Sequence, residues 1–298
     1  MADTRQQQSA VETGRADLMD ISFDGQLYRP LAIRYPTRVH PGLKLTTTYL
    51  FLNTGQPPFT SLKARQALNY AIDRTRIIQL LHLDSPDQAT PTCQVLPASY
   101  PSYQPYCPYT TGPGDGTWHG PDLATAARLA RESGTTHVPV TVWNGSAWDK
   151  KVGTYLVQVL RQLGYRATVR NVSQDQFDAA VKQPSRKIQL GLTGWAPDIP
   201  AASDFFLPLL TCRSYYNLAQ FCDPHVDQLA SQAQTAQQTD PAAARKLWAS
   251  IDHIVTDQAA WVPIFNESLT SFFVSARVGN YQESGYYIGP LLDQIWVR

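Results

Sequence analysis

The sequence predicts an α/β protein with a mixed, mostly parallel sheet flanked by helices. Strand-like and helix-like segments alternate between residues 137 and 193. The connections in this run are short, which favours right-handed β-α-β units. Two later helices each begin at an Asp-Pro pair, Asp223-Pro224 and Asp240-Pro241, because Asp can cap a helix whose first turn starts with Pro.

The elements before this run are less regular. Residues 1–45 show little periodicity and end in a turn-rich stretch, so we expect a connecting segment there. A strand is expected over 45–53, followed by one helix from Ser61 to about Leu81, where apolar residues recur every three or four positions. Residues 84–121 are dense in Pro, Tyr and Gly and predict a loop. Their glycine run at 112–116 matches no phosphate-binding motif, so we interpret it as a surface turn cluster.

The remaining elements follow in chain order. Capping residues indicate the helix starts, including the capping box that Ser173 and Gln176 form. The predicted helices are 122–133, 147–163, 173–182 and the two that follow Asp223 and Asp240. The predicted strands are 137–143, 165–172, 187–193, 261–265, 271–274 and 291–297.

Charge and hydropathy exclude two classes of partner. The 25 Lys+Arg residues balance 24 Asp+Glu residues, and no block of like charge occurs, so we expect no nucleic-acid partner. No apolar run approaches the ~20 residues that span a bilayer. Residues 1–30 lack the pattern of a secretory signal, so the protein is either cytosolic or has lost its signal.

The four cysteines form two sequence-local pairs, Cys93 with Cys107 and Cys212 with Cys222. Their spacings do not match a zinc site, and we favour disulfides over free buried thiols. Four cysteines permit three pairings, of which the local one is the simplest.

Catalytic signatures are missing from the sequence, so we predict neither an enzyme nor a cofactor. The six histidines form no HExxH motif, and no G-x-S-x-G elbow occurs. Cys222 and His225 would make a nucleophile and base only with a free thiol. Asp198 and Asp204 could be imagined as a paired acid and base, but nothing else in the sequence supports that role.

Two loops are candidates for binding a ligand, because ligands of open α/β sheets gather beyond the carboxyl ends of the strands. One loop runs from Asn144 to Trp148 and the other from Gly194 to Asp198. The tryptophans Trp148 and Trp195 would supply apolar walls, and Asp198 would attract an ammonium group or another donor. Core packing for the tryptophans, and a turn or helix cap for Asp198, remain open alternatives.

Five stretches carry a family resemblance. They are residues 51–59 (FLNTGQPPF), 64–74 (ARQALNYAIDR), the Gly194-Trp195-x-x-Asp198 turn, 216–227 and 257–265. Together they cover most of residues 46–297, and the second is the most specific. The chain resembles the peptide-binding proteins of ABC importers, the oligopeptide, dipeptide and nickel-binding group (family 5) of extracytoplasmic solute-binding proteins.

The resemblance implies a lobe of the periplasmic-binding-protein-like (type II) fold, in an extracytoplasmic protein that traps a peptide or other small solute and delivers it to an ABC permease. It places Asp198 at the ligand's amine with Trp195 beside it, and Asn144 and Trp148 in the loop that faces the ligand's carboxylate, which here has no Arg. Asn217 lies in a matching segment and is a further candidate. The resemblance also supports a bridge between Cys212 and Cys222.

Family members carry a whole N-terminal lobe ahead of the point where this chain begins. We therefore expect residues 46–268 to form the C-terminal lobe. Residues 1–45 and 269–298 would be a connecting and a return segment of the missing first lobe. A separate N-terminal lobe is then a possible partner. The alternative function is a ligand-sensing or interaction domain used in regulation.

Overall fold

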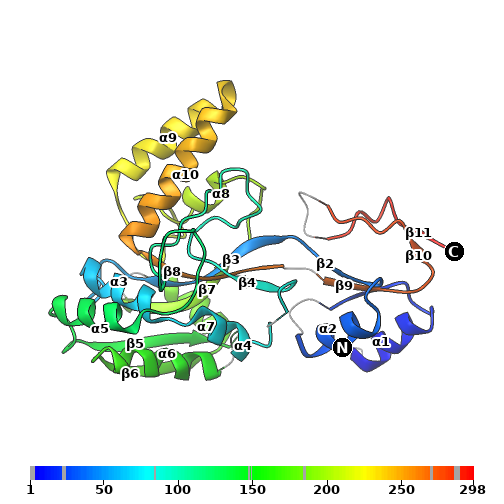
Figure 1. Cartoon of the computed structure of the whole chain (residues 1–298), viewed down its shortest axis with the longest axis horizontal. Helices are drawn as coiled ribbons and strands as arrows, with labels where there is room; N and C mark the ends of the chain where they lie inside the picture. The colour runs from blue at the N-terminus through cyan, green and yellow to red at the C-terminus, as the bar shows by residue number, and fades with distance from the viewer. Residues whose placement is uncertain are drawn as a thin grey trace.

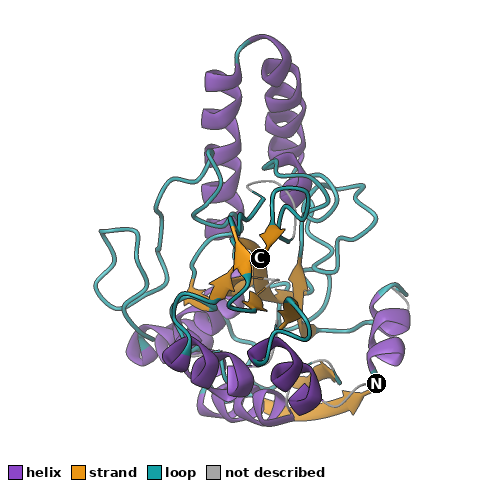
Figure 2. Cartoon of the chain, turned by 90° about the vertical axis from the view of Figure 1, so that its right-hand side faces the viewer, coloured by secondary structure: helices purple, strands orange, loops and turns teal. Residues whose placement is uncertain are grey.

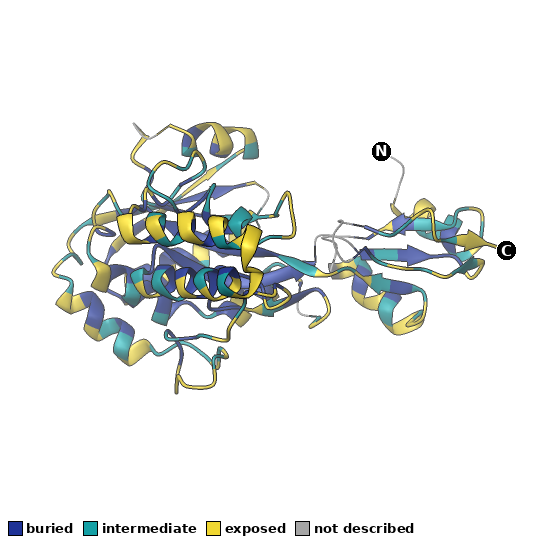
Figure 3. Cartoon of the chain, turned by 90° about the horizontal axis from the view of Figure 1, so that it is seen from above, coloured by how far each residue is buried: buried dark blue, intermediate teal, exposed yellow. Residues whose placement is uncertain are grey.

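The computed structural model describes residues 4–21, 25–83, 85–146, 148, 150–183, 186–268, 271–284 and 289–298. These residues form a large α/β part and a small part (Figures 1 and 3). The first helix and the last strand both lie in the small part, at the right of Figure 1.

The large part is built on a six-stranded sheet of order β4-β8-β3-β7-β5-β6. Its strands are β3 (Lys44–Leu52), β4 (Ala89–Pro91), β5 (Pro139–Gly145), β6 (Arg166–Val172), β7 (Leu190–Trp195) and β8 (Trp261–Ser268). β5 is parallel to β6 and to β7, which confirms the predicted β-α-β-α-β unit. The other three pairings are antiparallel, so the sheet is mixed as predicted but with a smaller parallel share.

Helices cover both faces of this sheet because its strands alternate apolar side chains between two cores. In β3, Leu50 and Leu52 belong to one core, and Tyr49 and Phe51 to the other. The first face is covered by α3 (Leu62–Ala71), α4 (Arg74–Leu80), α5 (Leu123–Glu132) and α6 (Lys150–Gln162). The second is covered by α7 (Gln174–Val181), α8 (Ser203–Phe206), α9 (Pro224–Thr239) and α10 (Pro241–Gln258). Figure 2 shows the α9–α10 hairpin projecting from the large part.

The small part has its own three-stranded sheet of order β1-β9-β2. Phe273 of the central strand is fully buried in a separate apolar cluster. The elements of the small part are α1 (Thr4–Glu12), β1 (Leu18–Asp20), α2 (Gly25–Arg34), β2 (Val39–Pro41), β9 (Ser271–Val274), β10 (Val278–Gly279) and β11 (Trp296–Val297). The segment expected to be a simple connection thus contains two helices and two strands. Of the strand expected over 291–297, only residues 296 and 297 form a strand.

Most predicted helix starts are confirmed by the side chains that cap them. Asp122, Asp223 and Asp240 each accept a backbone N–H of the first helical turn, and Ser173 forms the predicted capping box with Gln176. Gly134 adopts the positive φ of a residue that ends a helix.

The single helix predicted between residues 61 and 81 is wrong. Ile72 is extended, and Asp73 caps a second helix by accepting the N–H of Arg76. The second helix, which Asp73 caps, continues the apolar spacing of the first. The axis of the second helix, however, points in a different direction. The helix predicted from Ala147 begins at Lys150, and Ala147 itself lies outside the described residues.

Three strands end later than the sequence indicated, among them β8, which reaches Ser268 instead of Phe265. β5 reaches Gly145 and β7 reaches Trp195, each two residues beyond the predicted end. Asn144 and Trp195 are therefore strand residues at the sheet edge, where ladder hydrogen bonds fix their backbones. The region predicted to be a loop over 84–121 also contributes a strand, β4, to the other side of the sheet.

Both cysteine pairs are disulfides in the predicted local pairing, Cys93 with Cys107 and Cys212 with Cys222. The first ties together the two ends of a Pro- and Tyr-rich loop. The same loop is fixed to α10 by the fully buried carboxylate of Asp252, which accepts the Val95 N–H (2.9 Å) and the Gln94 side-chain amide (2.8 Å). Gln94 in turn accepts the N–H of Tyr106 (2.7 Å).

We predict that Asp252→Ala lowers the free energy of unfolding by about 2–3 kcal/mol, because it leaves two buried donors without an acceptor. Lys246→Ala, an exposed change on the same helix, should alter stability by less than about 0.5 kcal/mol. Guanidinium titration monitored by circular dichroism measures both. Equal stability of the two variants would refute the role of Asp252.

Candidate functional site

The strands of the six-stranded sheet end at two opposite sides of the sheet. One of these sides, here called the ligand edge, faces the small part. The carboxyl ends of β5, β6, β7 and β8 and the first residues of β3 meet there, because β3 is antiparallel to β7 and to β8. β2 ends at Pro41, three residues before β3, and β9 starts at Ser271, three residues after β8. The edge predicted to bind a ligand is therefore the edge from which both connections leave (Figure 1).

Trp195 and Asp198 lie at this edge, at the tip of β7. Trp195 pairs with Thr47 and is half-buried against the second core. The Asp198 side chain is exposed, and its backbone N–H donates to the carboxylate of Asp204 (2.7 Å). The turn is thus held by Asp204, which leaves the Asp198 carboxylate free of side-chain partners among the described residues.

The Asp204 carboxyl has a raised pKa because it is partly buried, an effect only partly offset by the N–H of Asp198. The negative charge of Asp198 acts in the same direction as burial. The Trp195 indole lies close enough to lower this pKa, although its Nε1 makes no hydrogen bond in the described residues. Two carboxylates and an indole therefore gather in one turn, and a ligand cation would find negative charge there.

A cluster of aromatic side chains extends from this turn into the loop that the Cys212–Cys222 disulfide closes. The Tyr216 ring lies 5.7 Å from that of Trp195, and Tyr215 lies 5.1 Å from Tyr216. The Lys182 ammonium sits 5.5 Å over the Tyr216 ring. The sequence placed Tyr216 in a segment that carries the family resemblance but assigned neither tyrosine to the site, because the proximity of Tyr216 to Trp195 depends on how residues 211–222 fold back onto the sheet.

Asn217 is buried within the same loop, and its side chain supports the loop. Its amide donates to the carbonyls of Thr211 and Phe221, and its oxygen accepts the Phe221 N–H. Both of its donors are thus engaged, and a contact between Asn217 and a ligand stays a prediction.

Asn144 and Trp148 line a different pocket, of 350 Å³, at the tips of β5 and β6. Asn144 is almost fully buried and donates to Asn171 on the neighbouring strand (3.1 Å). Its Oδ1 has no partner within the described residues. Ser146, Asn171 and Ser173 add further polar groups, and Lys150, not an Arg, supplies the positive charge in the pocket lining.

The residues of the two predicted loops thus occupy one edge but two faces of the sheet. Along β5 and β7, residues 140, 142, 190 and 192 belong to the first core, and Trp143 and Trp195 pack in the second. By the alternation of strand side chains, Asn144 lies on the first face and Trp195 on the second. A ligand that contacts both Asn144 and Trp195 would have to extend across the ends of the strands, from one face of the sheet to the other.

A polar cluster that the sequence did not single out lies at the same edge. The consecutive residues Thr46, Thr47 and Thr48 are all buried at the start of β3. Thr48 donates to Glu267 (2.8 Å), and Asn266 donates to Thr47 (2.9 Å). Burial raises the pKa of Glu267 to about 7, against the opposing effect of the Thr48 hydroxyl. In the sequence, the signal for this cluster was a run of three threonines at the start of one strand and an Asn-Glu-Ser run at the end of the strand that pairs with it.

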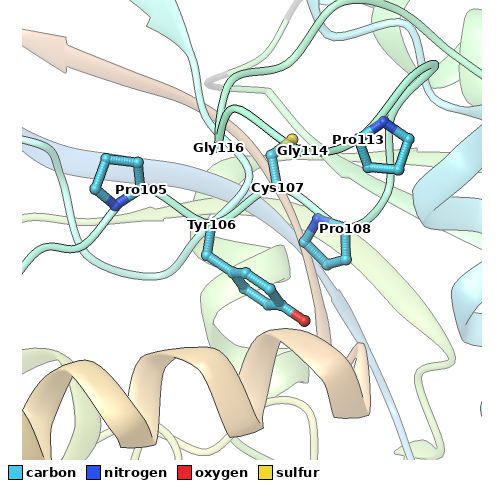
Figure 4. A pocket seen from close by; sticks show the side chains of 7 residues that line it. All are labelled: Pro105, Tyr106, Cys107, Pro108, Pro113, Gly114 and Gly116. Carbon is cyan, nitrogen blue, oxygen red and sulfur yellow. The ribbon is translucent and has the colours of Figure 1, made fainter.

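The glycine run at 112–116 forms a surface turn cluster, as predicted. Pro113, Gly114 and Gly116 line a 370 Å³ surface pocket with no basic residue among its lining (Figure 4). Gly116 has a positive φ, and a Cβ there would lie 2.5 Å from Pro105. Tyr106 reaches from this loop toward α10, where its hydroxyl donates to Asp257.

Other chemistry is limited in the part of the chain that the structure describes. Cys222 is in a disulfide, so it offers His225 no thiol. No group of three or more His, Cys, Asp or Glu that could hold a metal occurs among the described residues. Over the same residues, the search for a helix able to cross a bilayer found none.

We predict that Glu267→Gln makes stability less dependent on pH. The pKa of Glu267 is higher in the folded than in the unfolded chain, so the folded state binds the proton more tightly, and its contribution is lost as pH rises from about 4.5 to about 7. The Gln variant should therefore gain about 2 kcal/mol relative to wild type between pH 5 and pH 8.

Denaturant titrations at the two pH values measure this difference. Asp175→Asn, at an exposed carboxyl on α7, serves as the control and should follow the wild type. A Glu267→Gln variant whose stability changes with pH in parallel with wild type would contradict the assignment.

Comparisons with known proteins agree with this fold. A family model of bacterial extracellular solute-binding proteins, family 5 middle, matches residues 1–217. The glutathione-binding protein GsiB of Escherichia coli (strain K12) is 28% identical over 252 residues, a match that covers 81% of this chain and 45% of that protein. The chain thus spans about half the length of the curated relatives it matches.

Solved structures with the same fold include clavulanic acid biosynthesis oligopeptide binding protein 2, with a TM-score of 0.83 and 20% identity over 99% of this chain and 55% of that one. A dipeptide binding protein from Pseudoalteromonas sp. SM9913, in complex with Met-Leu, has a TM-score of 0.74 and 21% identity over 100% of this chain and 57% of that one. At such identities the likeness shows the fold. Because the family model matches more than half of the chain, this protein belongs to the family 5 bacterial extracellular solute-binding proteins.

Proposed function

We propose that this chain is the solute-binding component, or the C-terminal lobe of one, of an ABC importer, and that it holds the amine of a peptide-like ligand at Asp198. One observation supports the proposal: Asp198 is exposed, its N–H is held by Asp204, and it follows Trp195 by three residues at the sheet edge that faces the small part. An ammonium group there would form a charge-assisted hydrogen bond with Asp198 and pack on the indole.

The division into lobes supports the proposal. Residues 46–268 have two apolar cores of their own, and the small part has a third. We assign residues 1–45 and 269–298 to the first lobe. These segments form only part of it, and a separate N-terminal lobe would supply the rest. Only two chain connections join the parts, and such a pair can act as a hinge about which a cleft closes on its ligand.

The other end of the ligand would lie toward the pocket of Asn144 and Trp148. This pocket offers amide and hydroxyl groups and the ammonium of Lys150, so a ligand carboxylate there would pair with Lys150 and not with a guanidinium. The names of the relatives identify a glutathione-binding protein and a dipeptide-binding protein. Short peptides are therefore the first ligands to test on this chain.

The proposed partner is an ABC permease at the outer face of the cell membrane. An extracytoplasmic site agrees with the two disulfides, because such bonds persist in oxidising compartments. Transport of the ligand requires no chemistry on it, so we propose no enzymatic activity. The regulatory alternative stays a prediction that the genes beside this one would test, since a permease and ATPase pair implies import.

We predict that Asp198→Asn weakens binding of a free-amine peptide ten- to a hundredfold, the range for one charge-assisted hydrogen bond. Isothermal titration of the 298-residue chain with Met-Leu, a tripeptide and glutathione provides the measurement. An N-acetylated form of the tightest ligand should lose as much affinity, and its affinity should be the same for Asp198→Asn and wild type.

Asp175→Asn is again the matched control and should bind as wild type does. The proposal fails if none of these peptides binds the chain, or if Asp198→Asn and wild type bind the free-amine peptide equally.

A further inference from the structure

A second pocket of 230 Å³ lies beside α7, against the edge strand β6. Two arginines, Arg170 and Arg186, line it together with Trp143, Gln176, Ala179 and Gln183. It adjoins the pocket of Asn144 and Trp148, since Val172 and Gln176 line both. Nothing in the proposed peptide site uses either arginine.

Arg170 is held in place by a buried ring. It is paired in register with Trp143 on the neighbouring strand, and its guanidinium carbon lies 4.5 Å from the centroid of the Trp143 ring. Trp143 is only 7% exposed, so the core fixes the indole, and the indole in turn restrains the exposed guanidinium. This contact satisfies none of the N–H donors of Arg170, and no described residue is hydrogen-bonded to them.

Arg186 also keeps free donors. Its Nε donates to the side-chain oxygen of Gln183 (3.2 Å), which leaves both terminal nitrogens without a partner among the described residues. Neither Arg170 nor Arg186 forms an ion pair with a carboxylate in the part of the chain that the structure describes.

The acidic residues of α7 do not line this pocket. Gln176 and Ala179, three positions apart, share the helix face that lines it. Asp178 is about 200° around the helix from Gln176, and it accepts a hydrogen bond from Gln174 (2.9 Å). The pocket therefore holds two positive charges and two side-chain amides, with no negative charge among its lining residues.

We propose that this pocket binds a small anion through a carboxylate or phosphate group. A guanidinium presents its N–H groups as a planar fork that matches such oxygens in pairs, and the Gln amides can donate to the remaining ones. This site is independent of the amine site at Asp198, so either can exist without the other.

Isothermal titration of the 298-residue chain with inorganic phosphate and with succinate, at low ionic strength, tests the proposal. We expect saturable binding of at least one anion, weakened about tenfold or more by Arg170→Gln and by Arg186→Gln. Arg170→Lys should also bind more weakly than wild type, because an ammonium keeps the charge but loses the fork. The preferred anion shows whether the natural ligand carries a phosphate or carboxylates.

Three controls separate this site from other effects. Arg245→Gln removes an exposed arginine of α10 far from the pocket in sequence and should bind as wild type does. Asp198→Asn should leave anion binding unchanged, so failure of the peptide proposal does not affect this test. Circular dichroism of each variant confirms that it is folded. Absence of binding for both anions, or binding that survives both Arg→Gln changes, would overturn the proposal.

Discussion

The antiparallel pairing of β3 with β8 is the interaction on which the arrangement of the molecule depends. β3 also pairs with β7, so it joins the parallel half of the sheet to the antiparallel half. Both strands continue toward the small part, where Ser271–Val274 becomes the centre of the second sheet. Because the two strands are antiparallel, both connections leave from one edge. That edge also receives the carboxyl ends of the parallel strands, where α/β proteins bind ligands.

Buried polar groups tie β8 and the loops beside this pairing to the helices that cover the sheet. Arg74 is fully buried and donates to the carbonyls of Thr92 and Pro263, which ties the start of α4 to β8 and to the chain after β4. Asp252 does the same for the loop that the first disulfide closes. In a protein with only 16% charged residues, these few buried charges each satisfy backbone groups that apolar side chains would leave unpaired.

The electrostatics of the ligand edge are divided between two places. Negative charge gathers at the β7 tip, where Asp198 and Asp204 share a turn with Trp195. Positive charge gathers at the edge strand, where Arg170 and Arg186 line a pocket beside α7. The loop after β5 lies between them in the sheet order, and its pocket offers amide and hydroxyl groups together with the ammonium of Lys150. Such a surface can discriminate a ligand by its charged ends as well as by its size.

The sequence by itself determined the local elements and their order. Capping residues such as Ser173 and Asp240 act within one helical turn, so their effect is readable without the fold. The Gly-Trp-x-x-Asp turn and the Ala64–Arg74 block were sufficient to indicate the family, because they are contiguous in the chain. The local disulfide pairing was also readable, since it is the simplest of three.

Only the tertiary structure decided which side chains meet. The sequence placed Asn144 and Trp195 after their strands, whereas the sheet extends both strands by two residues through pairing with distant neighbours. It could not show that Asn217 supports its own loop, that Tyr216 lies near Trp195, or that Arg170 stacks on Trp143. Each of these contacts joins residues on different strands or loops, and their distances depend on sheet register and loop packing, which no local pattern encodes.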